Sequence, residues 1–463
     1  MELSFTDFKQ QFYSRIHDMR VFDCGDFNLL KVVLDGLKVD YVNKGMNQDL
    51  VLKSNLKIKT LLFLKRLKNR AAFVAAEKEL AKIGKTKKKY LLFDNGRVGY
   101  SETHEKISYY FGNIIPVLGD NNCYTIYQKA SELVGGSRFG ELDPLKHDAL
   151  AEDDFRMIAD LKQSFARISV TIAFSEVELK NVASAFNNFF IEYRLWRKLL
   201  SATDFKVCFF DQHYHREGMM LALKRKGIKS VELQHGLIAP EDIFYVFPPA
   251  IKEIAKRALF PDKILTYSNY WSGVLEAGYE FRKDQIDVIG RYQCNNTIVS
   301  KEEEQRFMNF TKGRDFILIT TQTFLHEHFI AYAMWLSQDL KKRNSDVPVV
   351  VKLHPSEKKS TYDAIGELDN VAILDCNTEF LLSRCSHHVT IFSTTLYDAS
   401  RYQCRNYSLE NERCWDYVKA CVDSGVSELL AMDENPLDRK EWKGKRGFFY
   451  DDFDIHKHKL VEL

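Results

Sequence analysis

The sequence predicts an α/β fold of two doubly wound, Rossmann-like domains facing a central cleft, with an extra helical region at the N-terminus. Three observations lead to this prediction. The chain has 463 residues, more than one ordinary core accommodates. Short apolar runs alternate with helical patterns over two separate stretches of the chain. The runs are almost continuously hydrophobic, as is typical of parallel strands covered by helices on both faces.

The composition is that of a globular protein, with 45% hydrophobic and 28% charged residues. A formal net charge of +2 provides no overall field toward nucleic acid, so no nucleic-acid partner is expected. The nine cysteines include no CxxC pair, which favours reduced thiols over a disulfide framework. No uncharged apolar run is long enough to span a membrane, and the N-terminus does not resemble a signal peptide. We expect a cytoplasmic protein.

Residues 1–89 are predicted to form the N-terminal helical and basic region. Within it, residues 51–89 carry thirteen Lys or Arg against two Glu, and apolar residues recur there at helical spacing. This pattern indicates a basic amphipathic helix or helix pair. One interpretation is peripheral contact with anionic lipid at the inner face of the cell membrane. The other is a solvated helix packed on its own domain.

The first Rossmann-like domain is predicted over residues 90–295. Its strands are expected at 90–93, 207–210, 230–233, 263–266 and 286–289. A long polar and charged helical stretch, at about residues 145–200, separates the first of these strands from the others.

The second Rossmann-like domain is predicted over residues 296–463. It follows a polar, unpatterned stretch at 289–305. Its strands are expected at 316–320, 347–353, 371–374 and 388–391, again with helical segments between them.

Polar residues follow four of the predicted strands, at the carboxyl ends where open α/β sheets bind ligands. The four sets are Asp211 to His215, Gln234 to Gly236, His354 to Glu357, and Ser393 to Thr395. Two strands from each predicted domain therefore deliver chemically useful groups to equivalent positions.

Asp211 is suited to act as a general base or to orient a sugar hydroxyl. His213 and His215 close by also suggest a metal site, but D-x-H-x-H matches no defined zinc pattern, so no metal is predicted. A third interpretation is that Asp211 caps the helix that begins near Glu217.

Of Gln234, His235 and Gly236, only the glycine is typical of a turn. Gln and His at a buried strand end cost stability unless they are hydrogen-bonded. The glycine permits close approach of a ligand or of another backbone segment. A ligand-binding pair and an internally bonded structural pair both remain open.

Ser393, Thr394 and Thr395 begin a predicted helix, so their hydroxyls and free N–H groups suit a phosphate. Simple capping of that helix is the alternative. His354 projects from a strand that Pro355 ends, where it can donate to a phosphate or protonate a leaving oxygen, or bond local carbonyls. The sequence contains no GxxxxGK[ST] and no GxGxxG that opens a βαβ unit.

Further candidates at strand ends are Asp94 after the first strand, and Thr321 and Gln322 after residues 316–320. Arg291, which closes the first series, either offers a phosphate fork or is a surface arginine.

Several motifs, taken in order, resemble the GT-B glycosyltransferases of bacterial capsule and lipopolysaccharide biosynthesis. The resemblance is to the His-Pro motif group that includes Kdo-, sialyl- and polyol-phosphate transferases. The motifs are QHG at 234–236, PDKILTYSNYWSGVLEAGYEFRKDQIDVIGR at 261–291, KLHP at 352–355, STTLYDA at 393–399 and RGFFYDDFD at 446–454. The resemblance covers about residues 205–455.

Two features depart from the pattern of this group. The paired acidic residues and glycine of sialyltransferases are absent, and FFDQHYHREG stands in a similar place. Tyr397, Asp398 and Ala399 follow the serine motif, where related enzymes often carry a glycine.

The resemblance implies a transferase that moves a sugar from a nucleotide donor, CMP- or UDP-linked, to a surface glycan or lipid-linked acceptor, without cofactor or metal. The second domain would bind the donor through His354, Pro355, Ser393, Thr394, Thr395, Thr321, Gln322 and Arg291. The first would take the acceptor through Gln234, His235, Gly236, His213 and Asp94. Asp211 or His235 would deprotonate the acceptor, and His354 would stabilise the departing phosphate. The alternatives are a nucleotide-sugar epimerase or hydrolase of the same shape and a non-catalytic glycan-assembly protein.

Overall fold

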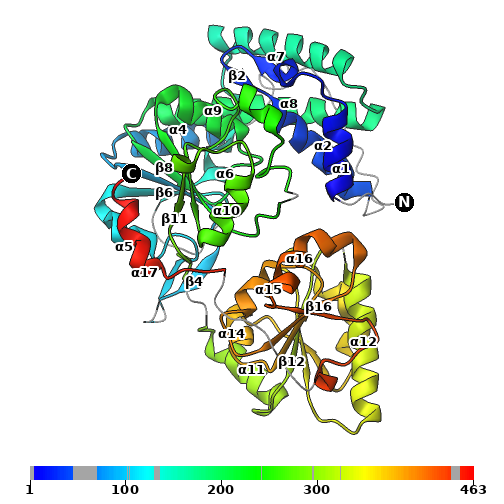
Figure 1. Ribbon diagram of the computed structural model, residues 1–463. Coiled ribbons are helices and arrows are strands. Elements are labelled where there is room, and N and C mark those ends of the chain that lie inside the picture. Colours follow the sequence, from blue (N-terminus) through cyan, green and yellow to red (C-terminus); the bar gives the residue numbers. More distant parts are fainter. Residues whose placement is uncertain are drawn as a thin grey trace. The chain divides into compact units, whose positions relative to one another are not determined.

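The computed structural model describes residues 5–44, 70–101, 103, 105–129, 136–240, 242–294, 297–323, 325–439 and 449–463 (Figure 1). The chain divides into two compact units. The first unit comprises Met1–Gly99, Lys106–Cys294 and Asp452–Leu463, and the second comprises Tyr100–Glu105 and Asn295–Asp451.

A seven-stranded parallel sheet forms the centre of the first unit. Its strands are β3 (Tyr90–Asp94), β6 (Cys123–Tyr127), β7 (Ser137–Arg138), β8 (Val207–Phe210), β9 (Lys229–Leu233), β10 (Lys263–Thr266) and β11 (Ile286–Val288). Their order is β11-β10-β9-β8-β3-β6-β7. Successive strands extend outward on both sides of the β3–β8 pair, so the strand order reverses there.

The helices of the first unit are α1 (Phe5–Ser14), α2 (Leu30–Lys44), α4 (Arg70–Gly84), α5 (Ile114–Leu118), α6 (Phe139–Leu142), α7 (Glu152–Thr171), α8 (Glu176–Ser201), α9 (Glu217–Lys226), α10 (Asn269–Ala277) and α17 (Phe453–His456). Short strands pair as β1 (Asp23–Cys24) with β2 (Phe27–Asn28), and β4 (Val98–Tyr100) with β5 (Lys106–Ser108).

The predicted helical stretch at 145–200 is two helices, α7 and α8. The chain breaks between them because Ser175 begins α8 with a reciprocal cap. Its hydroxyl accepts from Glu178 N at 3.2 Å, and Glu178 Oε2 accepts from Ser175 N at 2.7 Å.

The N-terminal residues belong to the first unit rather than forming a unit of their own, because α2 packs on α8 and α4 packs near α6. Helix α4 buries Phe73, Ala76, Leu80 and Ile83 and leaves its basic residues outward, which is the geometry of a solvated helix packed on its own domain. Residues 51–69 of the predicted basic helix lie outside the described residues. Among the described helices, none is long and apolar enough to cross a membrane.

The C-terminal segment also returns to the first unit, whereas the sequence prediction grouped residues 296–463 together. Residues Lys457–Leu460 form a 3-10 turn near α5, and Lys459 Nζ donates to Val288 O at 2.8 Å (Figure 1). These contacts hold the segment beside β11.

The second unit has a six-stranded parallel sheet of order β14-β13-β12-β15-β16-β17. Its strands are β12 (Ile317–Thr320), β13 (Val349–Lys352), β14 (Val371–Ile373), β15 (His387–Thr390), β16 (Arg405–Leu409) and β17 (Glu428–Leu430). Its helices are α11 (Lys301–Thr311), α12 (His326–Lys342), α13 (Asp363–Gly366), α14 (Thr378–Leu382), α15 (Thr394–Ala399) and α16 (Trp415–Asp423). This is the strand order of a Rossmann fold, and it reverses between β12 and β15.

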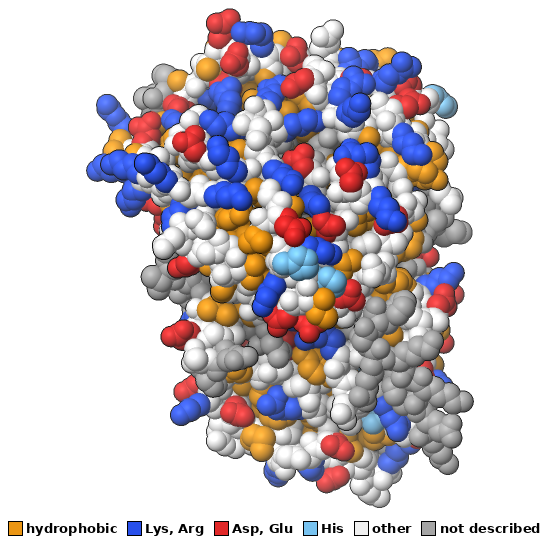
Figure 2. All heavy atoms as spheres, turned by 60° about the vertical axis from the view of Figure 1, so that its left-hand side comes forward, with side chains coloured by type: hydrophobic (Ala, Val, Ile, Leu, Met, Phe, Trp, Pro, Cys, Tyr) orange, Lys and Arg blue, Asp and Glu red, His pale blue; other side chains and the backbone are white. Residues whose placement is uncertain are grey.

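Both faces of each sheet are covered, so the strands lie inside the hydrophobic cores. Ile317, Ile319 and Val349 pack on one side of the second sheet, and Leu318 and Val350 pack on the other. The fold is therefore two Rossmann-like α/β units of GT-B-like class, as the sequence predicted. On the face shown in Figure 2, Lys and Arg side chains are interspersed with Asp and Glu, in keeping with the small net charge.

Candidate functional site

The point of strand reversal in the first unit brings two carboxyl groups together. Asp94 is the last residue of β3 and Asp211 follows β8, and the two strands are neighbours in the sheet. Both side chains are buried, with 0% and 5% of their surfaces exposed. Asn95 Nδ2 donates to Asp211 Oδ2 at 3.0 Å and links the two strand ends. Sheets of this topology bind ligands at such a point.

Asp94 is held by two local donors. Ser108 Oγ donates to Asp94 Oδ2 at 2.5 Å, and Gly96 N donates to Asp94 Oδ1 at 2.9 Å. Burial nevertheless raises the pKa of Asp94 to about 6; the two hydrogen bonds oppose this shift and the negative charge of Asp211 adds to it. Asp94 therefore exchanges its proton close to neutral pH.

Asp211 has both basic and acidic side chains around it, among them Arg216 and Glu232. Burial raises the pKa of its carboxyl group, while electrostatic interactions with His235 and Arg216 oppose the shift. The predicted role of a helix cap does not apply, because α9 begins after Arg216 without a side-chain cap. Asp211 remains free to exchange a proton with a bound group.

His235 lies near Asp211 and interacts with it electrostatically. Its Nε2 is 3.2 Å from the hydroxyl of Tyr214, and the two rings are 6.0 Å apart. Its Nδ1 is buried and has no hydrogen-bond partner among the described residues. A buried imidazole nitrogen without a partner has the capacity to bond a ligand.

Gln234 and His213 differ from the predicted contacts with an acceptor, because their polar atoms are used inside the protein. Gln234 is 1% exposed; its Nε2 donates to Gly236 O at 2.8 Å, and its Oε1 accepts from Tyr267 N at 2.9 Å. The ring of His213 is fully buried between Glu232 and the carbonyl of Phe244, the latter at 3.0 Å from Nε2. Burial lowers the pKa of His213, against the pull of the Glu232 carboxylate. Both residues fix the loops that carry Asp211 and His235.

Arg291 follows β11 in the first unit, at the edge of that sheet. Its Nη1 donates to the carbonyl of Gln293 at 3.3 Å. The predicted phosphate fork thus lies on a different unit from the other predicted donor-binding residues.

The reversal point of the second unit is held together by side chains. Thr320 Oγ1 lies 2.9 Å from Thr395 Oγ1 and 2.9 Å from His388 Nε2. His388 Nδ1 lies 2.7 Å from Asn406 Oδ1. Burial lowers the pKa of His388 to about 4, so this histidine is neutral at physiological pH. The network joins β12, β15 and β16 below the candidate ligand site.

His354 lies at the end of β13 on a loop that Glu357 anchors. The Glu357 carboxylate accepts from His354 N at 3.0 Å, from Tyr362 OH at 2.6 Å and from the hydroxyl of Thr321. His354 N also donates to Thr321 Oγ1 at 3.0 Å. Pro355 continues this loop with an exposed side chain, and Gln322 lies one residue beyond Thr321. Predicted residues from two strands therefore meet around one carboxylate.

Ser393 is the cap of α15, as the simpler of the two sequence interpretations expects. Its Oγ accepts from Thr395 N at 3.2 Å, and the helix, which begins at Thr394, has only six residues. Among the described residues, no group of three or more His, Cys, Asp or Glu is placed to hold a metal ion.

Sequence reasoning did not single out three residues that build these sites. They are Glu232, His388 and Asn406. Tyr214 and Glu357 lie in predicted strand-end segments and Asn95 follows Asp94, but none of these three was given a role of its own. His388 and Asn406 lie inside strands, where only the tertiary contacts reveal their pairing.

No family model matches the sequence, and no curated protein matches it. Among solved structures, the chain is similar to UDP-GlcNAc 2-epimerase from Neisseria meningitidis bound to UDP-GlcNAc, with 13% identity and a TM-score of 0.51, over 81% of this chain and 98% of that one. It is also similar to UDP-GlcNAc 2-epimerase from Methanocaldococcus jannaschii in complex with UDP-GlcNAc and UDP. The identity is 11% and the TM-score 0.49, over 81% of this chain and 98% of that one. A glycosyltransferase from Rickettsia africae matches with 13% identity and a TM-score of 0.41, over 81% of this chain and 94% of that one.

The likeness to the Neisseria structure concerns the fold, and it places the chain in the GT-B-like class of two Rossmann-like units.

Proposed function

We propose that the protein is an enzyme that acts on a nucleotide sugar. The observation that carries the proposal is the carboxyl pair Asp94 and Asp211 at the point of strand reversal in the first unit, with its link through Asn95. Buried carboxyl groups with raised pKa values, at the place where such sheets bind ligands, are typical of acid–base sites. The Neisseria protein of similar fold binds UDP-GlcNAc, which supports the choice of ligand class.

In the transferase form of the proposal, a sugar moves from the nucleotide to a hydroxyl of a glycan or lipid-linked acceptor. Asp211 takes the proton of that hydroxyl as the new bond to the anomeric carbon forms. The bond from that carbon to the phosphate oxygen breaks, and the nucleotide leaves with both electrons. His235 holds the acceptor through its unpartnered Nδ1.

The second unit would bind the nucleotide at its own point of reversal. Thr321 follows β12 and His354 follows β13 on a loop that Glu357 anchors, and Ser393 to Thr395 lie after strand β15. His354 would stabilise the charge of the leaving phosphate. These assignments follow the sequence resemblance.

A second candidate is an epimerase that uses the same pair of carboxyl groups. Epimerisation removes a proton from a sugar carbon and returns it to the other face, so it needs an acid and a base together. Burial raises the pKa of Asp94 to about 6 and also raises that of Asp211, which brings both groups closer to the range in which a carboxyl group either gives or takes a proton.

The products separate these candidates. The full chain is incubated with UDP-GlcNAc, other UDP-sugars and CMP-sugars, with and without neutral oligosaccharide acceptors, and the products are analysed by NMR and mass spectrometry. Nucleotide release that depends on the acceptor supports the transferase, and a new stereoisomer without acceptor supports the epimerase. Addition of EDTA tests whether the reaction requires a metal. No turnover of any nucleotide sugar would refute the proposed function and leave a non-catalytic role.

A further inference from the structure

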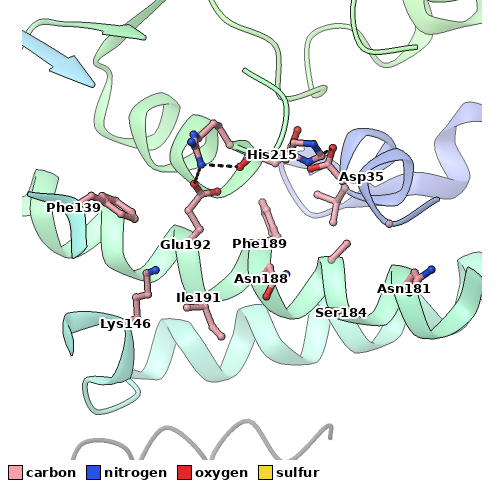
Figure 3. Close-up of a pocket in the computed structure, with 15 residues that line it drawn as sticks. Asp35, Phe139, Lys146, Asn181, Ser184, Asn188, Phe189, Ile191, Glu192 and His215 are labelled. Carbon is pink, nitrogen blue, oxygen red and sulfur yellow. Dashed lines mark hydrogen bonds and ion pairs between the residues drawn. The ribbon is translucent and has the colours of Figure 1, made fainter. Parts of the chain in front are cut away.

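A cavity of about 360 Å³ lies in the helical layer of the first unit, where α2, α8 and the start of α9 meet (Figure 3). One wall is a face of α8 that presents Asn181, Ser184 and Asn188 at helical spacing. Asp35 from α2 and His215, just before α9, lie across from it, as Figure 3 shows. The cavity is of a size that small ligands occupy (~300–1,000 Å³).

Two glycines explain why three helices approach so closely here. A Cβ atom on Gly36 would lie 2.7 Å from Val182 Cα, and one on Gly218 would lie 2.5 Å from Tyr193 N. The first contact joins α2 to α8, and the second joins α9 to α8. Backbones that meet at these two points leave the short polar side chains of α8 facing a hollow between them.

Each charged side chain that lines the cavity has a partner of opposite sign. His215 Nδ1 lies 3.0 Å from Asp35 Oδ1, and Arg216 Nη1 lies 4.0 Å from Glu192 Oε1. Glu217 Oε1 lies 3.4 Å from Lys31 Nζ, and Lys146 Nζ lies 2.9 Å from Asp143 Oδ1.

Burial, the largest cause in each case, raises the pKa values of Glu192 and Glu217 to about 7, so near neutral pH each carboxyl group is partly protonated. A partly protonated carboxyl group can donate as well as accept hydrogen bonds, which suits the hydroxyl groups of an uncharged ligand.

One buried group in the cavity has unused hydrogen-bonding capacity: the Nε atom of Arg216 has no hydrogen-bond partner among the residues that the structure describes. The half-buried Asn181 and Ser184 and the exposed Asn188 line the same cavity with amide and hydroxyl groups. Phe139 and Phe189 add aromatic surface. Amides, carboxylates and a hydroxyl, combined with aromatic faces, match a ring that carries hydroxyl groups on its rim and C–H groups on its faces.

We propose that this cavity binds a neutral saccharide unit. Its connection to the carboxyl pair is Arg216, which interacts electrostatically with both Asp211 and Glu192. Where the protein is a transferase, the cavity holds a sugar residue of the acceptor chain; that part of the inference rests on the proposed function.

The test measures saccharide binding by the full chain in the absence of nucleotide. Saturation-transfer NMR and calorimetry are run with N-acetylglucosamine, galactose, glucose and their disaccharides, and with inorganic phosphate as an anionic comparison. The variants are Asn188→Ala, which removes an amide, and Ser184→Leu, which fills the cavity. Asn187→Ala is the matched control, because Asn187 precedes Asn188 on the same helix and does not line the cavity.

We expect at least one neutral sugar to bind, with affinity at least fivefold weaker in Asn188→Ala, abolished in Ser184→Leu and unchanged in Asn187→Ala. Asp211→Asn should bind the sugar like the native chain, so that loss of turnover and loss of saccharide binding are separate results. Absence of binding by all the sugars, equal binding by all variants, or displacement of the sugar by phosphate would each overturn the inference. A circular-dichroism spectrum of each variant establishes that it is folded.

Discussion

The side-chain amide of Asn95 donates a hydrogen bond of 3.0 Å to Asp211 Oδ2, across 116 positions of the sequence. The bond joins the ends of β3 and β8, the two strands between which the strand order of the first unit reverses. It orients one carboxyl group of the pair, while Ser108 and Gly96 orient the other, Asp94. A pair held from both sides has little freedom to rearrange, which suits an acid–base site.

Replacement of Asp211 by Asn should abolish turnover of the nucleotide sugar. We expect a fall of about 100-fold or more in kcat, because general acid–base catalysis contributes roughly 10²–10⁴-fold. The matched control is Asp204→Asn, because Asp204 is exposed and lies just before the other end of β8. Steady-state kinetics with the nucleotide sugar that the product analysis identifies checks this prediction. Equal activity of the two variants would remove Asp211 from the reaction.

Asp94→Asn should stabilise the first unit at neutral pH while it lowers activity. Folded Asp94 keeps its proton up to a pKa of about 6, and the unfolded chain loses it above the ordinary value of 3.8. The folded protein thus holds one more proton between these values, and its stability falls as pH rises through that window.

Asparagine cannot ionise, so the Asp94→Asn variant escapes this loss. Relative to the native chain it should gain up to about 3 kcal/mol in the free energy of unfolding between pH 4 and pH 7. Denaturant unfolding at several pH values measures the difference. A difference that is constant over this range would show that Asp94 is not protonated as we infer.

Glu357→Ala should weaken nucleotide binding without affecting the first unit. The carboxylate accepts from His354 N, Tyr362 OH and the Thr321 hydroxyl, so its loss releases the loop that carries His354. Loss of hydrogen bonds to a charged group costs about 1.5–3 kcal/mol, which is roughly a 10- to 100-fold change in affinity. Calorimetry with UDP and CMP measures the effect, and Glu367→Ala, at an exposed position of the same unit, is the control.

Gly36→Ala should destabilise the first unit, because its Cβ would lie 2.7 Å from the backbone of Val182. Overpacking of this kind costs about 1–3 kcal/mol. Gly140→Ala is the control, since a Cβ there meets no atom within 4 Å. Thermal unfolding of both variants should show a lower midpoint for Gly36→Ala alone. Equal midpoints would mean that the α2–α8 contact relaxes without cost.

The strand ends predicted where polar groups gather in the first unit. Asp211 and His235 were predicted as alternative bases from the general rule that ligands bind beyond parallel strands, and in the structure His235 is near enough to Asp211 to interact with it electrostatically. Gln234 was predicted to contact an acceptor, but its amide bonds two backbone groups instead. A sequence shows that a buried glutamine needs partners, and it does not show whether the partners belong to the protein or to a ligand.

Other strands were not predicted from the sequence, because polar residues lie within or next to their hydrophobic runs. β6 (Cys123–Tyr127) follows two asparagines, and β16 (Arg405–Leu409) carries the polar residues Asn406 and Ser408. Asn406 is tolerated inside the sheet because it bonds His388 on the neighbouring strand at 2.7 Å. Such pairing removes the hydrophobic signal on which strand prediction depends.

The sequence by itself determined the two series of parallel strands and the polar residues that end them, because continuous apolar runs and strand termini are local features. The tertiary structure alone decided that Asp94 and Asp211 lie on neighbouring strands. It also decided that His213 is buried against Glu232 and that three helices leave a polar cavity beside Arg216. Strand order and close helix contacts depend on pairings between residues far apart in the chain, and no local pattern of hydrophobicity specifies which distant partners will meet.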